Sequence, residues 1–123
     1  MSLPGRYDIP LVQGATLSIP ITLKKADGSL YDLSNCTARA QIRKFHRSTA
    51  KVAEFTATIP EPKTQGVVIL SLTAIQTAAI PAGETSTDER SKYVYDVEIE
   101  NTVDGTVERV LNGNVYVSAE VTR

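Results

Sequence analysis

Tyr93-Val94-Tyr95-Asp96-Val97-Glu98-Ile99-Glu100 is the stretch that decides the fold. Apolar and polar side chains alternate along it, which is the period of a β-strand with one buried face. An Asp104-Gly105 pair follows, and then a second alternating run from Val107 to Val117. Asp-Gly between two alternating runs predicts a β-hairpin, with the odd-numbered residues 93–99 in the core. Gly113, between two asparagines, predicts a bulge in the second arm.

The same alternation recurs in the rest of the chain. It predicts strands over residues 15–24, 36–45, 52–59 and 67–72, and a short edge strand over 7–12 that contains Pro10. Thr73 and Gln76 have the spacing of a capping box and predict a short corner helix over 73–80. Residues 84–91 (ETSTDERS) have no apolar anchor and predict a mobile loop.

About seven evenly spaced strands and one corner helix predict an all-β fold, an immunoglobulin-like two-sheet β-sandwich. A small closed barrel is the alternative. In the immunoglobulin-like order, 36–45 is strand C and 92–100 is strand F, which are neighbours in one sheet. The chain predicts a single domain over 4–123, and Met1-Ser2-Leu3 is interpreted as a vector leader.

The composition offers little for catalysis or for metal binding. The chain has one histidine, His46, one cysteine, Cys36, and no tryptophan. Cys36 falls on the inward register, where a lone cysteine usually packs as a small apolar residue. Zinc needs several nitrogen or sulfur ligands, so we expect no metal, no cofactor and no enzymatic activity.

Charge also argues against nucleic acid and membrane partners. The formal net charge is −1 at pH 7, and no apolar run approaches the ~20 residues of a membrane span. Basic residues do gather between Arg39 and Lys51 around Phe45. We interpret them as a solvated loop and strand-facing ion pairs rather than as a site for single-stranded nucleic acid.

The acidic row Asp96, Glu98 and Glu100 has two interpretations. Its spacing suits a Ca²⁺ site, but such a row is more often a solvated sheet face. If strands C and F are neighbours, Arg39 and Arg43 lie opposite this row. We therefore predict cross-strand charge pairs of Arg39 and Arg43 with Asp96 and Glu98.

The end of the chain predicts an interaction surface. The run from Val115 to Val121 contains no proline, and its only charge is Glu120, so it could form an unprotected strand edge. The predicted interface comprises Tyr116, Ser118, Glu120, Thr122 and the outward-facing Val94. In the alternative, this run pairs with segment 7–12 of its own chain.

Several segments in this order resemble small virion-associated proteins of tailed bacteriophages, notably marine myophages, and the N-terminal domain of phage baseplate upper proteins. They are Gln13–Leu17, Ala26–Ser29, Tyr31–Ser34, Thr37–Arg43, Leu70–Thr77, Tyr93–Ile99 and Arg109–Val115.

The resemblance covers residues 13–121. It implies an immunoglobulin-like sandwich that serves as a non-enzymatic structural or assembly module in the tail, neck or baseplate. Such a module is made in the bacterial host cytoplasm and carried in the virion. Its partners would be other virion proteins or itself, with no small-molecule substrate. The alternative is a ligand- or carbohydrate-binding sandwich of a host or secreted protein.

Overall fold

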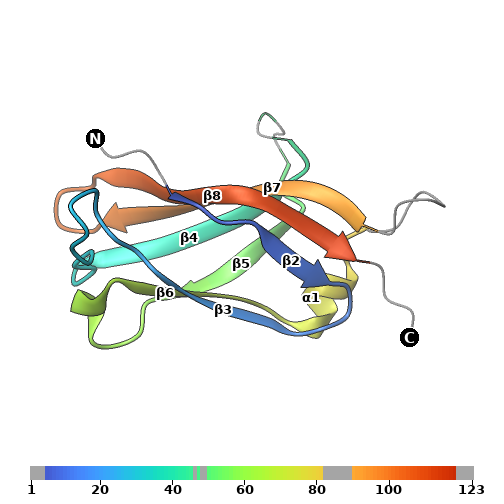
Figure 1. Ribbon diagram of the computed structural model, residues 1–123, viewed down its shortest axis with the longest axis horizontal. Helices are drawn as coiled ribbons and strands as arrows, with labels where there is room; N and C mark the ends of the chain where they lie inside the picture. Colours follow the sequence, from blue (N-terminus) through green and yellow to red (C-terminus); the bar gives the residue numbers. More distant parts are fainter. Residues whose placement is uncertain (1–4, 46, 48–49, 82–89, 119–123) are drawn as a thin grey trace.

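The fold is all-β with one corner helix. A computed structural model describes residues 5–45, 47, 50–81 and 90–118 (Figure 1). Along the chain its elements are β1 Gly5–Arg6, β2 Ile9–Val12, β3 Leu17–Thr22, β4 Cys36–Arg43, β5 Ala53–Thr58, the 3₁₀ turn η1 Lys63–Gln65, β6 Val67–Leu72, α1 Ala74–Ala78, β7 Arg90–Asn101 and β8 Val107–Ser118. Among these described residues, no helix is long and apolar enough to cross a membrane.

The strands form one curled sheet, a half-barrel, in the order β1-β8-β7-β4-β5-β6-β3. Strand β5 makes the sheet continuous, because residues 53–55 pair with β4 and residues 56–58 pair with β6. In Figure 1, β5 leaves β4 and approaches β6 along its length. The all-β prediction is confirmed. The prediction of two separate sheets is not confirmed, because β5 pairs with both β4 and β6 and makes one continuous sheet. This sheet does not close into a barrel.

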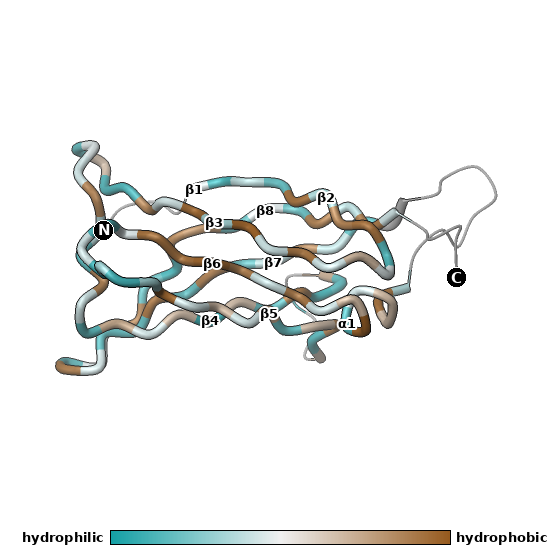
Figure 2. The backbone as a smooth tube through the Cα atoms, turned by 90° about the horizontal axis from the view of Figure 1, so that it is seen from below, coloured by the Kyte–Doolittle hydropathy of each residue, from teal (hydrophilic) through white to brown (hydrophobic). Residues whose placement is uncertain are grey.

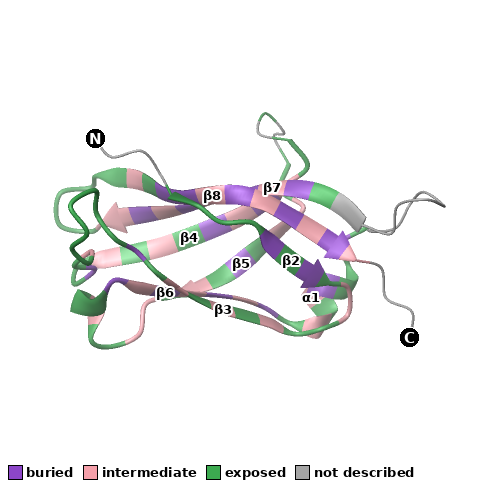
Figure 3. Ribbon diagram, in the orientation of Figure 1, coloured by how far each residue is buried: buried purple, intermediate pink, exposed green. Residues whose placement is uncertain are grey.

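The predicted hairpin is present, and its inward register is confirmed. Strands β7 and β8 are antiparallel, and the odd-numbered residues 93–99 are buried. Figure 2 shows hydrophobic and hydrophilic residues following one another along the strands, and Figure 3 shows the matching alternation of burial on β8. One core joins the inner faces of all the longer strands, with Ile42, Phe55, Leu70, Tyr95, Val97 and Val117 at its centre.

The start of β7 differs from the prediction. Arg90 and Ser91 belong to the strand rather than to a loop, because they pair with Ser118 and Val117 of β8. The rest of the predicted loop, residues 84–89, lies outside the described residues.

The corner helix forms as its sequence predicts. The Thr73 hydroxyl accepts a hydrogen bond from the Gln76 amide at 3.1 Å, and the Thr73 amide donates to the Gln76 side chain at 2.8 Å. This capping box satisfies backbone donors at the start of α1. Thr77, fully buried, fixes the helix to the connection between β2 and β3 by accepting from Gly14 N and donating to the Ala15 carbonyl.

The bulge in β8 lies at Val110 and not at Gly113. Val97 pairs with Leu111 while Glu98 pairs with Arg109, so Val110 is the extra residue. Gly113 has another role, because a Cβ at this position would lie 2.1 Å from the Tyr7 carbonyl oxygen. The asparagine-flanked glycine therefore permits a close approach of the N-terminal strand.

Prolines occupy both free edges of the sheet. Leu23 N donates to the Gly66 carbonyl, which continues the register of β3 with β6. The backbone of the odd-numbered residues of β3 therefore bonds to β6, and the backbone nitrogen of Pro20 points away from β6. On β2, Tyr7 N and Gln13 N donate to β8 carbonyls, so Pro10 also faces outward. Within the described chain no strand pairs with these two edges. Because proline has no N–H to donate, each edge lacks one hydrogen-bond donor within its strand, which disfavours further strand pairing there.

Candidate functional site

The outer face of β4, β7 and β8 carries the four residues of the predicted charge pairs, and of the predicted pairs Arg39 with Glu98 forms an ion pair. Strands β4 and β7 are antiparallel neighbours, with Arg39 opposite Glu98 and Gln41 opposite Asp96. The side chains of even-numbered β7 residues therefore share this face with those of odd-numbered β4 residues. We call this surface the outer charged face and define it by Arg39, Gln41, Arg43, Asp96, Glu98, Glu100 and Arg109.

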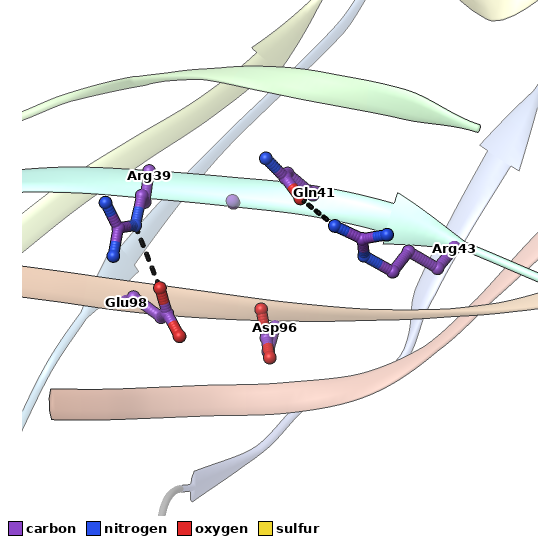
Figure 4. Close-up of a pocket in the computed structure, with 6 residues that line it drawn as sticks. Arg39, Gln41, Arg43, Asp96 and Glu98 are labelled. Atoms are coloured by element: carbon purple, nitrogen blue, oxygen red, sulfur yellow. Dashed lines mark hydrogen bonds and ion pairs between the residues drawn. The ribbon is translucent and has the colours of Figure 1, made fainter. Parts of the chain in front are cut away.

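Arg39 and Glu98 form the shortest ion pair of this face. Arg39 Nε donates to Glu98 Oε1 at 2.8 Å (Figure 4). Arg39 Nη1 also lies 3.9 Å from Glu100 Oε1. The hydrogen bond to Glu98, followed by the charge of that carboxylate, raises the pKa of the Arg39 guanidinium. Both side chains are substantially exposed, so the pair contributes to register more than to stability.

Arg43 and Asp96 lie on the same face with additional partners. Arg43 Nη2 donates to Gln41 Oε1 at 2.7 Å (Figure 4). Asp96 Oδ2 lies 3.9 Å from Arg109 Nη1 on β8. Sequence reasoning missed Arg109, because an unbroken alternation over 107–117 places it on the same side as Val115 and Val117. The bulge at Val110 reverses the parity and brings Arg109 to the outer charged face.

These side chains border a shallow depression of about 330 Å³ between β4 and β7. Arg39, Arg43, Asp96 and Glu98 bring two positive and two negative charges to it. Among the described residues, no group of three or more acidic, histidine or cysteine side chains is arranged to hold a metal ion. The acidic row faces arginines instead, and this mixed-charge surface suits contact with a polar protein surface.

The predicted interface residues lie on two strands at one end of the sheet. Val94 is opposite Asn114, and the Asn114 side-chain amide donates to the Tyr116 hydroxyl at 3.2 Å. Val94, Tyr116 and Ser118 are each partly buried. Glu120 and Thr122 lie outside the described residues.

The strand edge that motivated this interface is covered. Strand β2 pairs in parallel with β8, with Ile9 opposite Val115 and Val12 opposite Ser118. This is the alternative pairing with segment 7–12, so the backbone of β8 up to Ser118 is not open to a partner. Any contact made by Val94, Tyr116 and Ser118 must therefore use the sheet face.

Of the two residues considered for catalysis, only Cys36 lies within the described residues. Cys36 is partly buried beside the core, and burial is the main cause that raises the pKa of its thiol. A raised pKa makes the thiolate scarcer at neutral pH. His46 lies outside the described residues.

Comparison with known proteins gives distant similarities of shape. No family model matches the chain, and no curated protein matches it. The Lin-41 filamin domain is similar over 82% of this chain and 81% of that one, with 19% identity and a TM-score of 0.37. A family 123 glycoside hydrolase from Clostridium perfringens is similar over 97% of this chain, with 12% identity and a TM-score of 0.40. This chain spans about a quarter of that hydrolase (24%).

Proposed function

We propose that this chain is a non-enzymatic assembly domain of a tailed-bacteriophage virion. In this proposal it lies in the tail, neck or baseplate and acts through protein–protein contacts, either with other virion proteins or with copies of itself. It reaches the virion after synthesis in the cytoplasm of the bacterial host. The proposal rests on the ordered motifs between residues 13 and 121 that resemble small virion-associated proteins.

The observation that carries the proposal is the order of strand pairing. Residues 36–43 pair with 94–101, and residues 17–22 pair with 67–72. These are the neighbours C–F and B–E of an immunoglobulin-like domain, and the parallel pairing of β2 with β8 adds a first strand beside strand G. We propose that the curled sheet is a distorted immunoglobulin-like sandwich, the fold that the resemblance implies.

The outer charged face and the neighbouring residues Val94, Tyr116 and Ser118 form the contact surface in this proposal. They project from three adjacent long strands, so their positions are fixed by the sheet. A rigid surface loses little conformational entropy on binding. Mixed charges then favour partners whose charges alternate in the complementary order.

Co-expression tests this function. The full chain is produced together with the products of the genes adjacent to its own, and complexes are separated by size-exclusion chromatography and identified by mass spectrometry. We expect co-elution with a tail, neck or baseplate protein in a fixed ratio. Neighbouring genes unrelated to virions, together with elution of the chain by itself, contradict the proposal.

Sedimentation tests self-assembly. The full chain is measured from micromolar to millimolar concentration beside Tyr116→Lys. We expect the wild-type chain to associate as its concentration rises and the variant to remain monomeric. A wild-type chain that stays monomeric throughout restricts the proposal to contacts with other virion proteins.

A further inference from the structure

We infer that the open seam of the half-barrel, between the end of β3 and the β1–β8 pair, docks a short extended segment of a partner protein in which apolar and acidic residues alternate. The seam holds a cleft of about 390 Å³, within the range of ~300–1,000 Å³ that is usual for ligand sites. This inference rests on the proposed function, because it specifies the chemistry of a protein partner. It uses a different part of the molecule from the outer charged face.

The floor of the cleft is apolar. Ile21 of β3 and Leu23, just after β3, line one side of it. Val110 and Leu111, at the bulge of β8, line the other side. Leu23, Val110 and Leu111 are buried and belong to the core, and Ile21 packs against it. An apolar side chain placed in the cleft would extend this core and remove its own surface from water.

The charge at the cleft is positive. Lys24 and Lys25 border it, and no carboxylate is among its lining residues. Three other clefts of the described chain each contain at least one carboxylate: Asp96 and Glu98, Asp96 alone, or Asp32 and Glu108. Lys25 also interacts electrostatically with Asp27 and Asp32, which do not line the cleft. The apolar floor and the two lysines together suit an apolar group that has an acidic neighbour.

Two carboxylates near the cleft already have partners. Glu108 accepts a hydrogen bond from the Tyr31 hydroxyl at 3.4 Å. Tyr31 lines both this cleft and the neighbouring cleft that contains Glu108. Asp27 accepts from the Ser29 amide at the tip of the turn. The Lys25 ammonium lies 6.0 Å from the centre of the Tyr31 ring, which holds it beside the cleft.

Backbone groups at the seam favour an extended peptide over a compact ligand. Leu23 N donates to Gly66, and the Leu23 carbonyl accepts from Tyr31 N, so both of its groups point away from the seam. In an alternating ladder, the N–H and C=O of Thr22 and Lys24 therefore point into the seam. Thr22 lies opposite Val67, and Lys24 forms an isolated bridge with Leu30. The hydrogen bonds of that bridge belong to the neighbouring residues, Tyr31 N to the Leu23 carbonyl and Lys25 N to the Ser29 carbonyl, and not to Lys24 itself. A partner strand could pair with this edge, and Pro20 would limit the pairing to its carboxyl-terminal part.

A synthetic peptide tests the inference on the full chain. The probe is an acetylated, amidated heptapeptide of alternating valine and glutamate (VEVEVEV), and its control is the same peptide with lysine in place of glutamate. Binding is followed by NMR shifts of backbone amides. We expect VEVEVEV to shift residues 21–25, 110 and 111, and to bind at least tenfold more tightly than the lysine peptide. Equal affinities, or shifts confined to the outer charged face, overturn the inference.

Two variants separate the charge from the backbone contribution. Lys24→Glu with Lys25→Glu should reverse the preference between the two peptides, whereas Lys44→Glu with Lys92→Glu, an equal change of charge at exposed positions elsewhere, should preserve it. Thr22→Pro should weaken VEVEVEV binding about tenfold, because it removes an outward N–H and leaves the β6 ladder intact, as Pro20 already does. Circular dichroism verifies that each variant is folded. Unchanged affinity in folded Thr22→Pro rules out strand pairing at the seam.

The two proposals can fail separately. If the chain co-elutes with a virion protein but VEVEVEV does not bind, the seam inference is wrong and the assembly function stands. If VEVEVEV binds at the seam but the chain neither forms a complex with virion proteins nor associates with itself, the assembly function is wrong and the seam site stands.

Discussion

The Tyr95 hydroxyl donates a hydrogen bond to the Tyr7 carbonyl oxygen, 2.5 Å away and 88 residues distant in sequence. This bond is one of two side-chain hydrogen bonds that replace a backbone hydrogen bond between the N-terminal strand and β8. In the regular parallel pattern the Tyr7 carbonyl would accept from Asn114 N, but the Asp8 carboxylate accepts that bond at 2.9 Å instead. The Tyr7 carbonyl turns toward the core, over Gly113, and Tyr95 satisfies it.

Tyr95→Phe should reduce the free energy of unfolding by about 1–3 kcal/mol, the usual cost of leaving a buried acceptor without its donor. The ring remains, so its edge contact with Phe55 should persist. Urea unfolding measures the loss. Tyr31→Phe is the matched control, because its hydroxyl makes only a 3.4 Å bond in a more exposed position, and it should cost less. Equal losses in the two variants would contradict the structural role of the Tyr7–Tyr95 bond.

Alkaline pH should destabilise the wild-type chain through Tyr95. Burial raises the pKa of Tyr95 above its ordinary value of 10.0, because the interior disfavours the tyrosinate. The folded state then holds this proton more tightly than the unfolded state does. The resulting stability is fully present below pH 10 and is lost as the pH rises toward the raised pKa.

Tyr95→Phe has no proton to lose at this position, so its free energy of unfolding should fall less above pH 10. The stability gap between the two proteins should therefore narrow there. Urea unfolding at pH 8 and at two values above pH 10 measures this gap. A stability gap that is constant across pH would show that ionisation of Tyr95 does not cause the loss of stability at alkaline pH.

Gly113→Ala should detach the N-terminal strand. The new Cβ would lie 2.1 Å from the Tyr7 carbonyl oxygen, so backbone must move, at a cost of about 1–3 kcal/mol or more. Hydrogen exchange of amides in residues 5–12 should become faster. Gly28→Ala is the control, since Gly28 has a φ of +87° and open space around it and is strained only locally. Accelerated exchange at 5–12 in both variants would argue against the close approach at Gly113.

Arg39 and Glu98 should be weakly coupled. A double-mutant cycle with Arg39→Ala and Glu98→Ala should give a favourable interaction smaller than the loss in Tyr95→Phe, since both side chains are largely exposed. Added salt should reduce the interaction further, because exposed charges are screened. A coupling that persists in 1 M salt would require a more buried pair than the structure has.

The sequence by itself determined most of the longer strands, the inner face of β7 and the corner helix. Each follows from local physics. Alternation over 93–100 can bury only one set of side chains, Asp104-Gly105 supplies a turn with Gly105 at a φ of +77°, and Thr73 with Gln76 caps α1. The pairing of Arg39 with Glu98 followed from one further assumption, the adjacency of strands C and F.

Only the tertiary structure decided how far the sheet curls, where β8 bulges and what covers its edge. These features depend on contacts between residues far apart in sequence. Strand β5 divides its pairing between β4 and β6, and the close approach of Tyr7 to Gly113 is visible only once the N-terminal strand is in place. Val110 and Leu111 are both apolar and interrupt the alternation, but two adjacent apolar residues do not by themselves specify a bulge. The bulge at Val110 reverses the side of the sheet on which Arg109 lies, and it thereby completes the outer charged face.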